Sequence, residues 1–268
     1  MKTRASNLNP AAAIALVVIA IGVAKFVFAA DHNQARVSEV IRDVRLLPGH
    51  GAARAANVND TIREGTAVRT GTDSRAELTF SDQTLTRLGA NTVFSFGIGA
   101  RTYDLGSGAI LMSAPKENGT IKISTAVANC AVNGFNAILE AHSKNWNKVL
   151  MLEGDGDVWL KKNPNDHRHM HSWQILIFRP DASVLPQPVE FDVCKVISAG
   201  LLITGFKNKL PDMPTLVAEC DKQKSQPPTT NLVDPTNQNI IDQSVNARPP
   251  ENTPPPIRPT PPPGDRPR

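Results

Sequence analysis

Turn-forming residues recur at short intervals between residues 35 and 160, and the runs between them are too short for typical helices. These turns lie at residues 70–74, 81–84, 89–91, 97–99, 106–108, 117–119, 143–145 and 154–156. Evenly spaced short strands joined by glycine-rich turns are typical of sandwiches, barrels and solenoids. The spacing therefore predicts an all-β fold with many short strands, in a curled, solenoid-like or sandwich arrangement.

Alternation within single runs supports this prediction. Ala76, Leu78 and Phe80 point to one side of a strand, whereas Glu77 and Thr79 point to the other. One segment disagrees, because Val37, Val40, Ile41 and Val44 have the i, i+3, i+4, i+7 spacing of an amphipathic helix. Their β-branched side chains favour a strand. The residues alone leave both possibilities open.

Five blocks of the sequence together carry a family resemblance. They are residues 59–80 (NDTIREGTAVRTGTDSRAELTF), 81–96 (SDQTLTRLGANTVFSF), 103–112 (YDLGSGAILM), 121–126 (IKISTA) and 149–154 (VLMLEG). In this order they resemble the FecR domain, over residues 37–160. The resemblance implies that the opening segment is a strand, and that the domain is an extracytoplasmic all-β module without catalytic activity.

The start of the chain has the three parts of a secretory signal peptide. Lys2 and Arg4 precede an apolar run at residues 11–24, and small residues follow at Ala29 and Ala30. We expect residues 1–30 to be a cleaved signal peptide or, if Lys25 reaches the interface, an uncleaved signal anchor. In both cases the body is exported, to the periplasm or cell envelope. About ten residues precede the apolar run, too few for the cytoplasmic anti-sigma region of FecR-type iron-uptake regulators.

The rest of the exported body divides by composition. Residues 35–160 form the FecR-like domain, and residues 161–220 are predicted to be a β-rich extension. Residues 221–268 are rich in Pro, Thr, Asn and Gln, and end in PPPIRPTPPPGDRPR. Such a segment has too few apolar side chains to offset the entropy of ordering, so we predict a disordered tail.

Charge and cysteine content limit the partners. The net charge of +4 is spread along the chain, without a basic helix or aromatic-interleaved basic patch, which excludes a typical nucleic-acid-binding protein. Three cysteines allow one disulfide, and Cys194–Cys220 is the pair to test first. Three buried thiols are the simpler interpretation, and we favour it over a disulfide.

Two clusters have the composition of metal sites. His167, His169 and His171 would share one face of a strand and could hold a transition metal. A solvated hairpin is the simpler interpretation. Glu153, Asp155 and Asp157 repeat at the same spacing and could hold Ca²⁺, although their neighbouring glycines favour an ordinary tight turn. We therefore assign no metal, cofactor or catalytic residues.

Acidic and basic side chains also lie close together around two strands. Asp73, Glu77 and Asp82 lie near Arg75 and Arg87, and we interpret them as cross-strand charge pairs on the solvent face rather than as catalytic groups. No nucleophile elbow, zinc-protease motif or phosphate loop is present in the sequence, so an enzyme is not expected.

Trp146, Trp159 and Trp173 are the candidate recognition aromatics, with core packing the alternative for Trp159. The sequence predicts a non-enzymatic envelope module that binds or scaffolds a protein or glycan, with membrane contact only through an uncleaved N-terminal segment. The alternative is the extracytoplasmic sensor or regulatory component of a transmembrane signalling system of the iron-uptake type.

Overall fold

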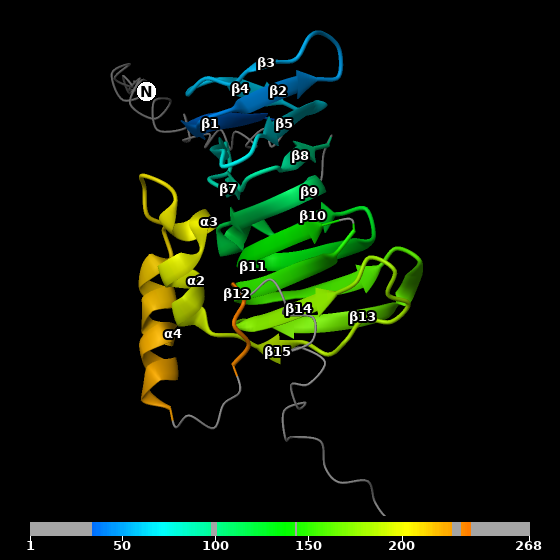
Figure 1. Ribbon diagram of the computed structural model, residues 1–268, viewed down its shortest axis with the longest axis vertical. Coiled ribbons are helices and arrows are strands. Elements are labelled where there is room, and N and C mark those ends of the chain that lie inside the picture. Colours follow the sequence, from blue (N-terminus) through cyan, green and yellow to red (C-terminus); the bar gives the residue numbers. More distant parts are fainter. Residues whose placement is uncertain (1–33, 98–100, 143, 227–231, 237–268) are drawn as a thin grey trace, which may run out of the picture. The chain divides into compact units, whose positions relative to one another are not determined.

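The computed structural model describes residues 34–97, 101–142, 144–226 and 232–236, so the predicted leader and most of the predicted tail lie outside the described residues. The described part is mostly β, with many short strands in a curled sheet (Figure 1). The predicted fold class is therefore confirmed. Three α-helices near the C-terminal end lie against one side of the sheet.

The strand pairings form two walls. We call the first the helix-covered wall. Its strands are, in order, β4 (Thr61–Arg63), β1 (Gln34–Ile41), β6 (Arg75–Phe80), β7 (Leu85–Leu88), β9 (Thr102–Ser113), β11 (Ala128–His142), β12 (Trp146–Leu160), β14 (Gln174–Phe178) and β15 (Val189–Glu190).

The second wall, which we call the open wall, shares three of these strands. Its order is β3 (Arg54–Ala55), β2 (Val44–Pro48), β5 (Thr66–Thr70), β8 (Val93–Phe96), β9, β10 (Thr120–Ser124), β11, β12 and β13 (Asn163–His171). Strands β9, β11 and β12 each pass from one wall into the other, because their two halves have different partners.

Glycines allow these long strands to bend. Gly108 has a φ of +88°, and a Cβ there would approach Thr92 Oγ1 to 2.3 Å. Gly154 has a φ of +95°, next to the register shifts of the β11–β12 pairing. Glycine adopts positive φ without steric cost, so both residues permit a bend that other side chains would resist. The turns predicted at residues 106–108 and 154–156 are therefore wrong, because the chain continues as a strand through both.

The main hydrophobic core fills the space between the walls. Leu78 and Phe80 contribute to it from the helix-covered wall, and Phe94, Tyr103 and Ile123 contribute from the open wall. Phe80 packs edge-on against Tyr103, with ring centroids 5.3 Å apart. Burying each large side chain stabilises the fold by about 1.5–3 kcal/mol, so this core holds the walls together.

A bulge explains the helix-like spacing of the opening segment. Val37 pairs with Leu78 and Val40 pairs with Ala76, with a register shift between Val37 and Glu39. The extra residue turns Val40 to the same side as Val37, so an i, i+3 pair faces one core. The strand implied by the family resemblance is confirmed.

A second core lies between the helix-covered wall and the helices. The helices are α2 (Val193–Ala199), α3 (Leu201–Thr204) and α4 (Met213–Ser225). Val196, Leu202 and Leu216 pack against Ile138 and other apolar side chains of the strands. The prediction of a β-rich extension over residues 161–220 is therefore wrong beyond β15.

The described chain also continues past residue 221, where the disordered tail was predicted to begin. Helix α4 runs to Ser225, and Val233 is 4% exposed and forms a parallel bridge with Phe191. The apolar Val233 side chain completes the second core, which composition alone did not indicate. Among the described residues, no helix is both long and apolar enough to cross a bilayer.

Candidate functional site

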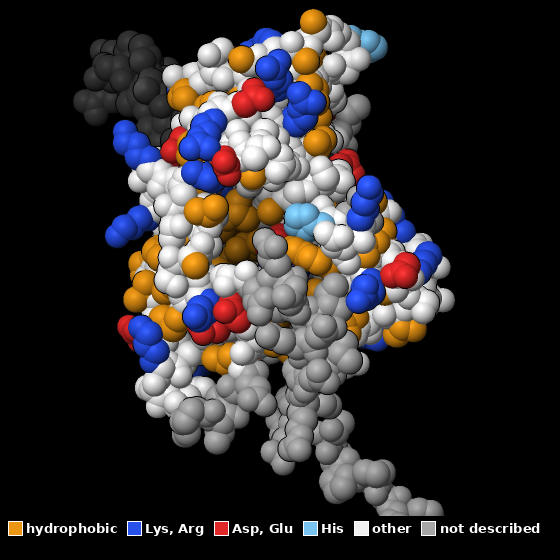
Figure 2. Space-filling model, in the orientation of Figure 1, with side chains coloured by type: hydrophobic (Ala, Val, Ile, Leu, Met, Phe, Trp, Pro, Cys, Tyr) orange, Lys and Arg blue, Asp and Glu red, His pale blue; other side chains and the backbone are white. Residues whose placement is uncertain are grey.

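A half-open groove of about 560 Å³ lies between the outer face of the helix-covered wall and helices α2 and α3. Figure 2 shows a hollow between helices and strands that is lined by apolar side chains. Ile138 and Leu150 line it from the strands, and Val196, Leu201 and Leu202 line it from the helices. Concave apolar surfaces with a few placed polar groups are the usual form of binding sites.

The polar groups of the groove come from a cross-strand pair at the end of β11 and the start of β12. Glu140 pairs in register with Lys148, and Lys148 Nζ lies 2.8 Å from Glu140 Oε1. The Lys148 side chain is 6% exposed and also donates to the carbonyl of Pro235, at 2.8 Å. This lysine therefore holds both a carboxylate and a backbone carbonyl.

An aromatic pair borders this charged pair. His142 and Trp146 are also cross-strand partners, with ring centroids 4.2 Å apart. Lys148 Nζ lies 4.8 Å from the centroid of the indole, within the range of a cation–π contact. His142 Nε2 lies 3.6 Å from Glu140 Oε2. The four side chains form one cluster at one side of the groove.

Opposing effects act on the Glu140 carboxyl. Burial, the largest effect, raises its pKa, but the hydrogen bond from His142 and the charge and hydrogen bond of Lys148 together lower the pKa below its ordinary value. Glu140 therefore remains ionised at neutral pH. Its charge is compensated by Lys148, so the cluster presents a paired polar group rather than a free base.

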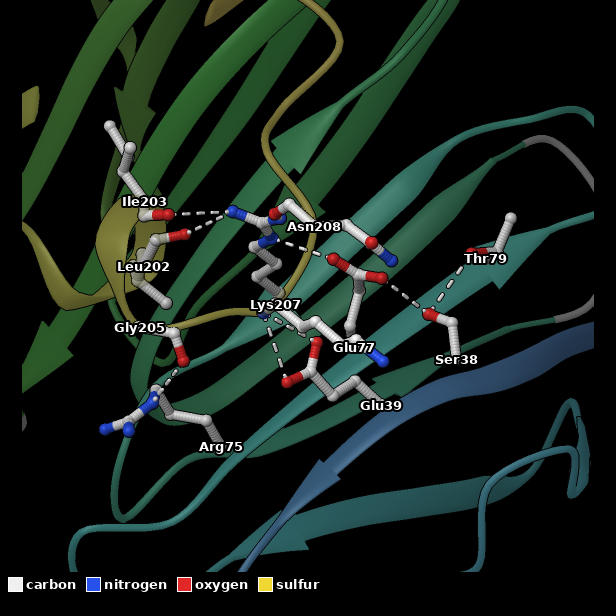
Figure 3. Close-up of polar contacts among 11 residues, drawn as sticks. Ser38, Glu39, Arg75, Glu77, Thr79, Leu202, Ile203, Gly205, Lys207 and Asn208 are labelled. Carbon is white, nitrogen blue, oxygen red and sulfur yellow. Dashed lines mark hydrogen bonds and ion pairs between the residues drawn. The ribbon is translucent and has the colours of Figure 1, made fainter.

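A buried ion pair fixes the helical layer on the sheet beside the groove. Glu77 and Arg87 are cross-strand partners on β6 and β7, with Nε and Oε2 2.9 Å apart and the Arg87 side chain 0% exposed. Arg87 also donates to the carbonyls of Leu202 and Ile203 in α3, at 3.1 and 3.2 Å. Figure 3 shows these carbonyls and the Glu77 carboxylate converging on one guanidinium.

Further contacts hold the loop that follows α3. Arg75 donates to the carbonyl of Gly205, and the backbone N–H of Lys207 donates to the Glu39 carboxylate (Figure 3). The guanidinium of Arg87 lies 4.5 Å from the centroid of the Phe206 ring. This loop is therefore anchored on β1, β6 and β7, and it fixes α3 as a wall of the groove.

A disulfide joins Cys194 in α2 to Cys220 in α4. This is the pair that the sequence offered for a first test, whereas the favoured interpretation of three buried thiols is wrong. Cys130 is free and buried, and burial raises the pKa of its thiol to about 12. The covalent link restrains the helices that line and support the groove.

Comparison with known proteins now supports the resemblance noted in the sequence. Residues 66–155 match the family described as FecR protein. The chain carries a FecR domain. This match runs from β5 into β12, so the domain supplies shared strands of both walls. No curated protein matches the chain.

Two crystal structures of a putative anti-sigma factor from Parabacteroides distasonis, at 1.65 and 2.50 Å resolution, are similar to the chain. They are 14% and 13% identical to it, each with a TM-score of 0.43 over 50% of this chain. The match spans less than two thirds of their length, at 65% and 64% of those chains.

The three histidines lie on the outermost strand of the open wall, β13, and not in the groove. His167, His169 and His171 are all exposed on one face, as predicted. His169 Nδ1 lies 3.0 Å from Asp157 Oδ1. Within the described ranges, no group of three or more His, Cys, Asp or Glu side chains is arranged to hold a metal ion. The same holds for the acidic cluster that was weighed as a Ca²⁺ site, where Glu153 instead pairs with Lys116 at 3.0 Å.

The predicted charge pairs of the FecR domain form, but not on the solvent face. Glu77 and Arg87 are buried because the helical layer covers the outer face of β6 and β7. Asp82 pairs with Arg101 rather than Arg87, and this pair is also buried. Of the predicted set, only Asp73 forms an exposed pair, with Arg42. The solvent-face interpretation failed because the sequence did not show which sheet face the helices cover.

The three tryptophans have three different environments. Trp146 lines the groove, Trp173 packs against the second core, and Trp159 is partly buried on the open wall. Sequence reasoning missed Glu140 and Lys148, which form the polar part of the groove. Their alternation with Leu139 and Val149 is a usable signal, since it places both charges on the face opposite the main core.

Proposed function

We propose that this protein is a non-enzymatic binding module of the cell envelope, and that the groove binds an extended segment of a partner protein. The groove itself supports this proposal most directly. It combines an apolar floor, a paired polar group and an aromatic border, and its helical wall is fixed by the Glu77–Arg87 pair. A preorganised site of this kind binds without the cost of ordering its own walls.

A peptide segment of a partner fits the groove because a segment of this chain already lies at its edge, in a turn at Pro235 and Thr236. Pro235 and Thr236 line the groove, and Lys148 Nζ binds the carbonyl of Pro235. Two residues before Pro235, Val233 forms a parallel bridge with Phe191. The sheet edge next to the groove therefore accepts the backbone of a further segment. Leu201, which lines the groove, is 60% exposed and available for a partner's apolar side chain.

The remaining sequence predictions belong to the same proposal. We place the body outside the cytoplasm, with residues 1–30 as a cleaved signal or an anchor, and residues 35–160 as the FecR-like domain. The family match at residues 66–155 supports the domain assignment. The state of Lys148 fits a binding role, because its amine is engaged by Glu140 and by the carbonyl of Pro235.

A second candidate is a regulatory role in a transmembrane signalling system of the iron-uptake type. The match to the FecR protein family favours it. In that case the partner segment belongs to another component of the system, and binding at the groove changes its signal. The same groove serves both functions, so identifying the partner distinguishes them.

Affinity capture from cross-linked envelope fractions tests the proposal. Leu201→Glu places a charge on the apolar lining, whereas Val184→Glu places the same charge on a residue that is similarly exposed, at 59%, and is not among the groove's lining residues. We expect one partner to be captured by the native chain and by Val184→Glu, but not by Leu201→Glu. Equal capture by both variants would show that the groove is not the binding site.

A further inference from the structure

The open wall carries three rows of mostly polar side chains, two of which run across five strands and one across four. Strand pairing sets these rows, because residues in register on neighbouring strands lie side by side on one face. The first row is Asp104, Ser124, Asn129, Trp159 and His167; the second is Thr102, Lys122, Ala131, Asp157 and His169; the third is Thr120, Asn133, Asp155 and His171. We call these residues the polar face.

Every residue of the polar face is exposed or partly buried. The residues that alternate with them along the strands, such as Ile123, Cys130 and Val158, face the main core. Strands lie about 4.8 Å apart, so the face extends roughly 19 Å across the five strands. The FecR domain contributes the rows from β9 to β12, and β13 adds the histidines. The groove lies on the other wall, so the two sites use separate surfaces.

At least four polar side chains of this face have no hydrogen-bond or ion-pair partner among the described residues. In the part of the chain that the structure describes, the side chains of Lys122, Ser124 and Asn129 make no hydrogen bond or ion pair, and neither does that of Asp155. Exposed donors and acceptors are ordinarily satisfied by water. Arranged in rows on a rigid sheet, they are also available to a ligand with many hydroxyl groups.

The polar face contains one tryptophan. Trp159 lies beside His167, with ring centroids 5.5 Å apart and 32° between the ring planes. An indole offers an apolar face for C–H groups and an N–H donor for hydrogen bonds. Sugars present both kinds of group, because a pyranose ring has C–H faces and hydroxyl edges.

Charge and composition exclude the other common ligands. With neutral imidazoles, Asp104, Asp155 and Asp157 against Lys122 give a formal charge of −2. Nucleic acids and other polyanions require an excess of basic groups. A protein interface needs a core of several aromatic or apolar side chains, and this face has one large one.

We propose that the polar face binds an unbranched polysaccharide of neutral sugars, with Trp159 stacking on a sugar ring and the polar rows binding hydroxyl groups. This inference does not depend on the peptide-binding groove. It assigns a glycan to the open wall and leaves the helix-covered wall to the protein partner.

Isothermal titration calorimetry with the full chain tests this proposal. We expect cellohexaose or chitohexaose, which are neutral, to bind, and hexagalacturonate to bind at least tenfold more weakly. Trp159→Ala should reduce affinity for the neutral glycan by at least tenfold. Ala131→Arg, which places a long side chain at the middle of the face, should reduce it as well and guards against misfolding of the tryptophan variant.

Leu201→Glu is the matched control, because it alters the groove and leaves the polar face intact. We expect its glycan affinity to equal that of the native chain. Failure of all three glycans to bind would overturn the proposal. So would equal binding of hexagalacturonate, or unchanged affinity in both Trp159→Ala and Ala131→Arg.

Discussion

Arg87 and Glu77 form an ion pair that is closed off from solvent on every side, with side chains 0% and 3% exposed. The pair exists because two layers meet there. The strands supply the charges, α3 supplies the carbonyl acceptors for Nη1 of Arg87, and the carbonyl of Asn208, in the loop after α3, accepts from Nη2. A single side chain thus links the FecR domain to the helices that follow it.

Removing one member of this pair should be more harmful than removing both. Arg87→Met leaves the Glu77 carboxylate buried without a counter-charge, which costs about 3–5 kcal/mol. The double variant Arg87→Met with Glu77→Leu should lose less stability than Arg87→Met alone. Urea denaturation of the single and double variants measures both values, and a double variant that is the least stable of the set would contradict the argument.

The disulfide should contribute a comparable amount. Replacing Cys194 and Cys220 together by Ala removes a link across 26 residues and should lower stability by about 2–4 kcal/mol.

Alkylation of the native, unreduced protein should label no cysteine, because Cys130 is buried and its thiol pKa is raised to about 12. Mass spectrometry after unfolding without reductant should then find one labelled residue, Cys130.

Neighbouring positions on β6 should differ in cost. Leu78→Ala should lower stability by about 2–5 kcal/mol, because Leu78 is 0% exposed and its truncation leaves a cavity. Thr79→Ala should cost under about 1 kcal/mol, since its partly buried hydroxyl makes a single long hydrogen bond to Ser38, at 3.3 Å. Urea denaturation of both variants measures these losses of unfolding free energy. Equal losses for Leu78→Ala and Thr79→Ala would contradict the burial of Leu78 on one face of β6.

Acid should lower the free energy of unfolding in part because it protonates Glu140. The pKa of Glu140 is lowered in the folded protein, so its ionised form contributes stability above the ordinary carboxyl pKa of about 4.3. That contribution is lost as the pH falls through the lower folded value. Glu140→Gln should therefore flatten the decline in unfolding free energy between pH 6 and pH 3. Glu117→Gln, at an exposed position, should leave the slope unchanged.

The position of a C-terminal truncation should matter. A chain ending at Thr236 should melt within about 2 °C of the full chain if residues 237–268 contribute little burial. A chain ending at Cys220 loses Val233, the Lys148–Pro235 contact and the hydrogen bonds of Gln223 with Phe191 and Val193. It should melt several degrees lower, in contrast to the composition-based expectation that this shorter chain is equally stable. Differential scanning calorimetry compares the three chains.

The local sequence pattern predicted which residues form strands more reliably than it predicted which side chains face solvent. The alternation of Ala76, Leu78 and Phe80 correctly placed these residues in the core, because a strand's period of two holds regardless of what covers its other face. The same alternation placed Glu77 in solvent, which is wrong because α3 comes from a segment more than a hundred residues away. Pairings over such distances leave no mark on the local pattern.

The groove could not be predicted from the sequence either, because it is formed by segments that lie far apart along the chain. Glu140 and Lys148 are eight residues apart and meet through a hairpin, but their role depends on α2 and on Pro235. The glycines at 108 and 154 predict turns from sequence, because glycine is common both at chain reversals and at bends within a strand. Only the strand partners on each side distinguish the two.

The passage of β9, β11 and β12 through both walls limits how such a protein can change over evolution. Neither wall can be removed or replaced as a unit, because the backbone of each shared strand would be cut in its middle. In the described part of the chain, new strands can be added at the ends of the walls beyond β3, β4 or β13, whereas the edge beside β15 already carries the bridge from Phe191 to Val233. A lineage built on this plan therefore lengthens or shortens at its ends while its centre stays constant.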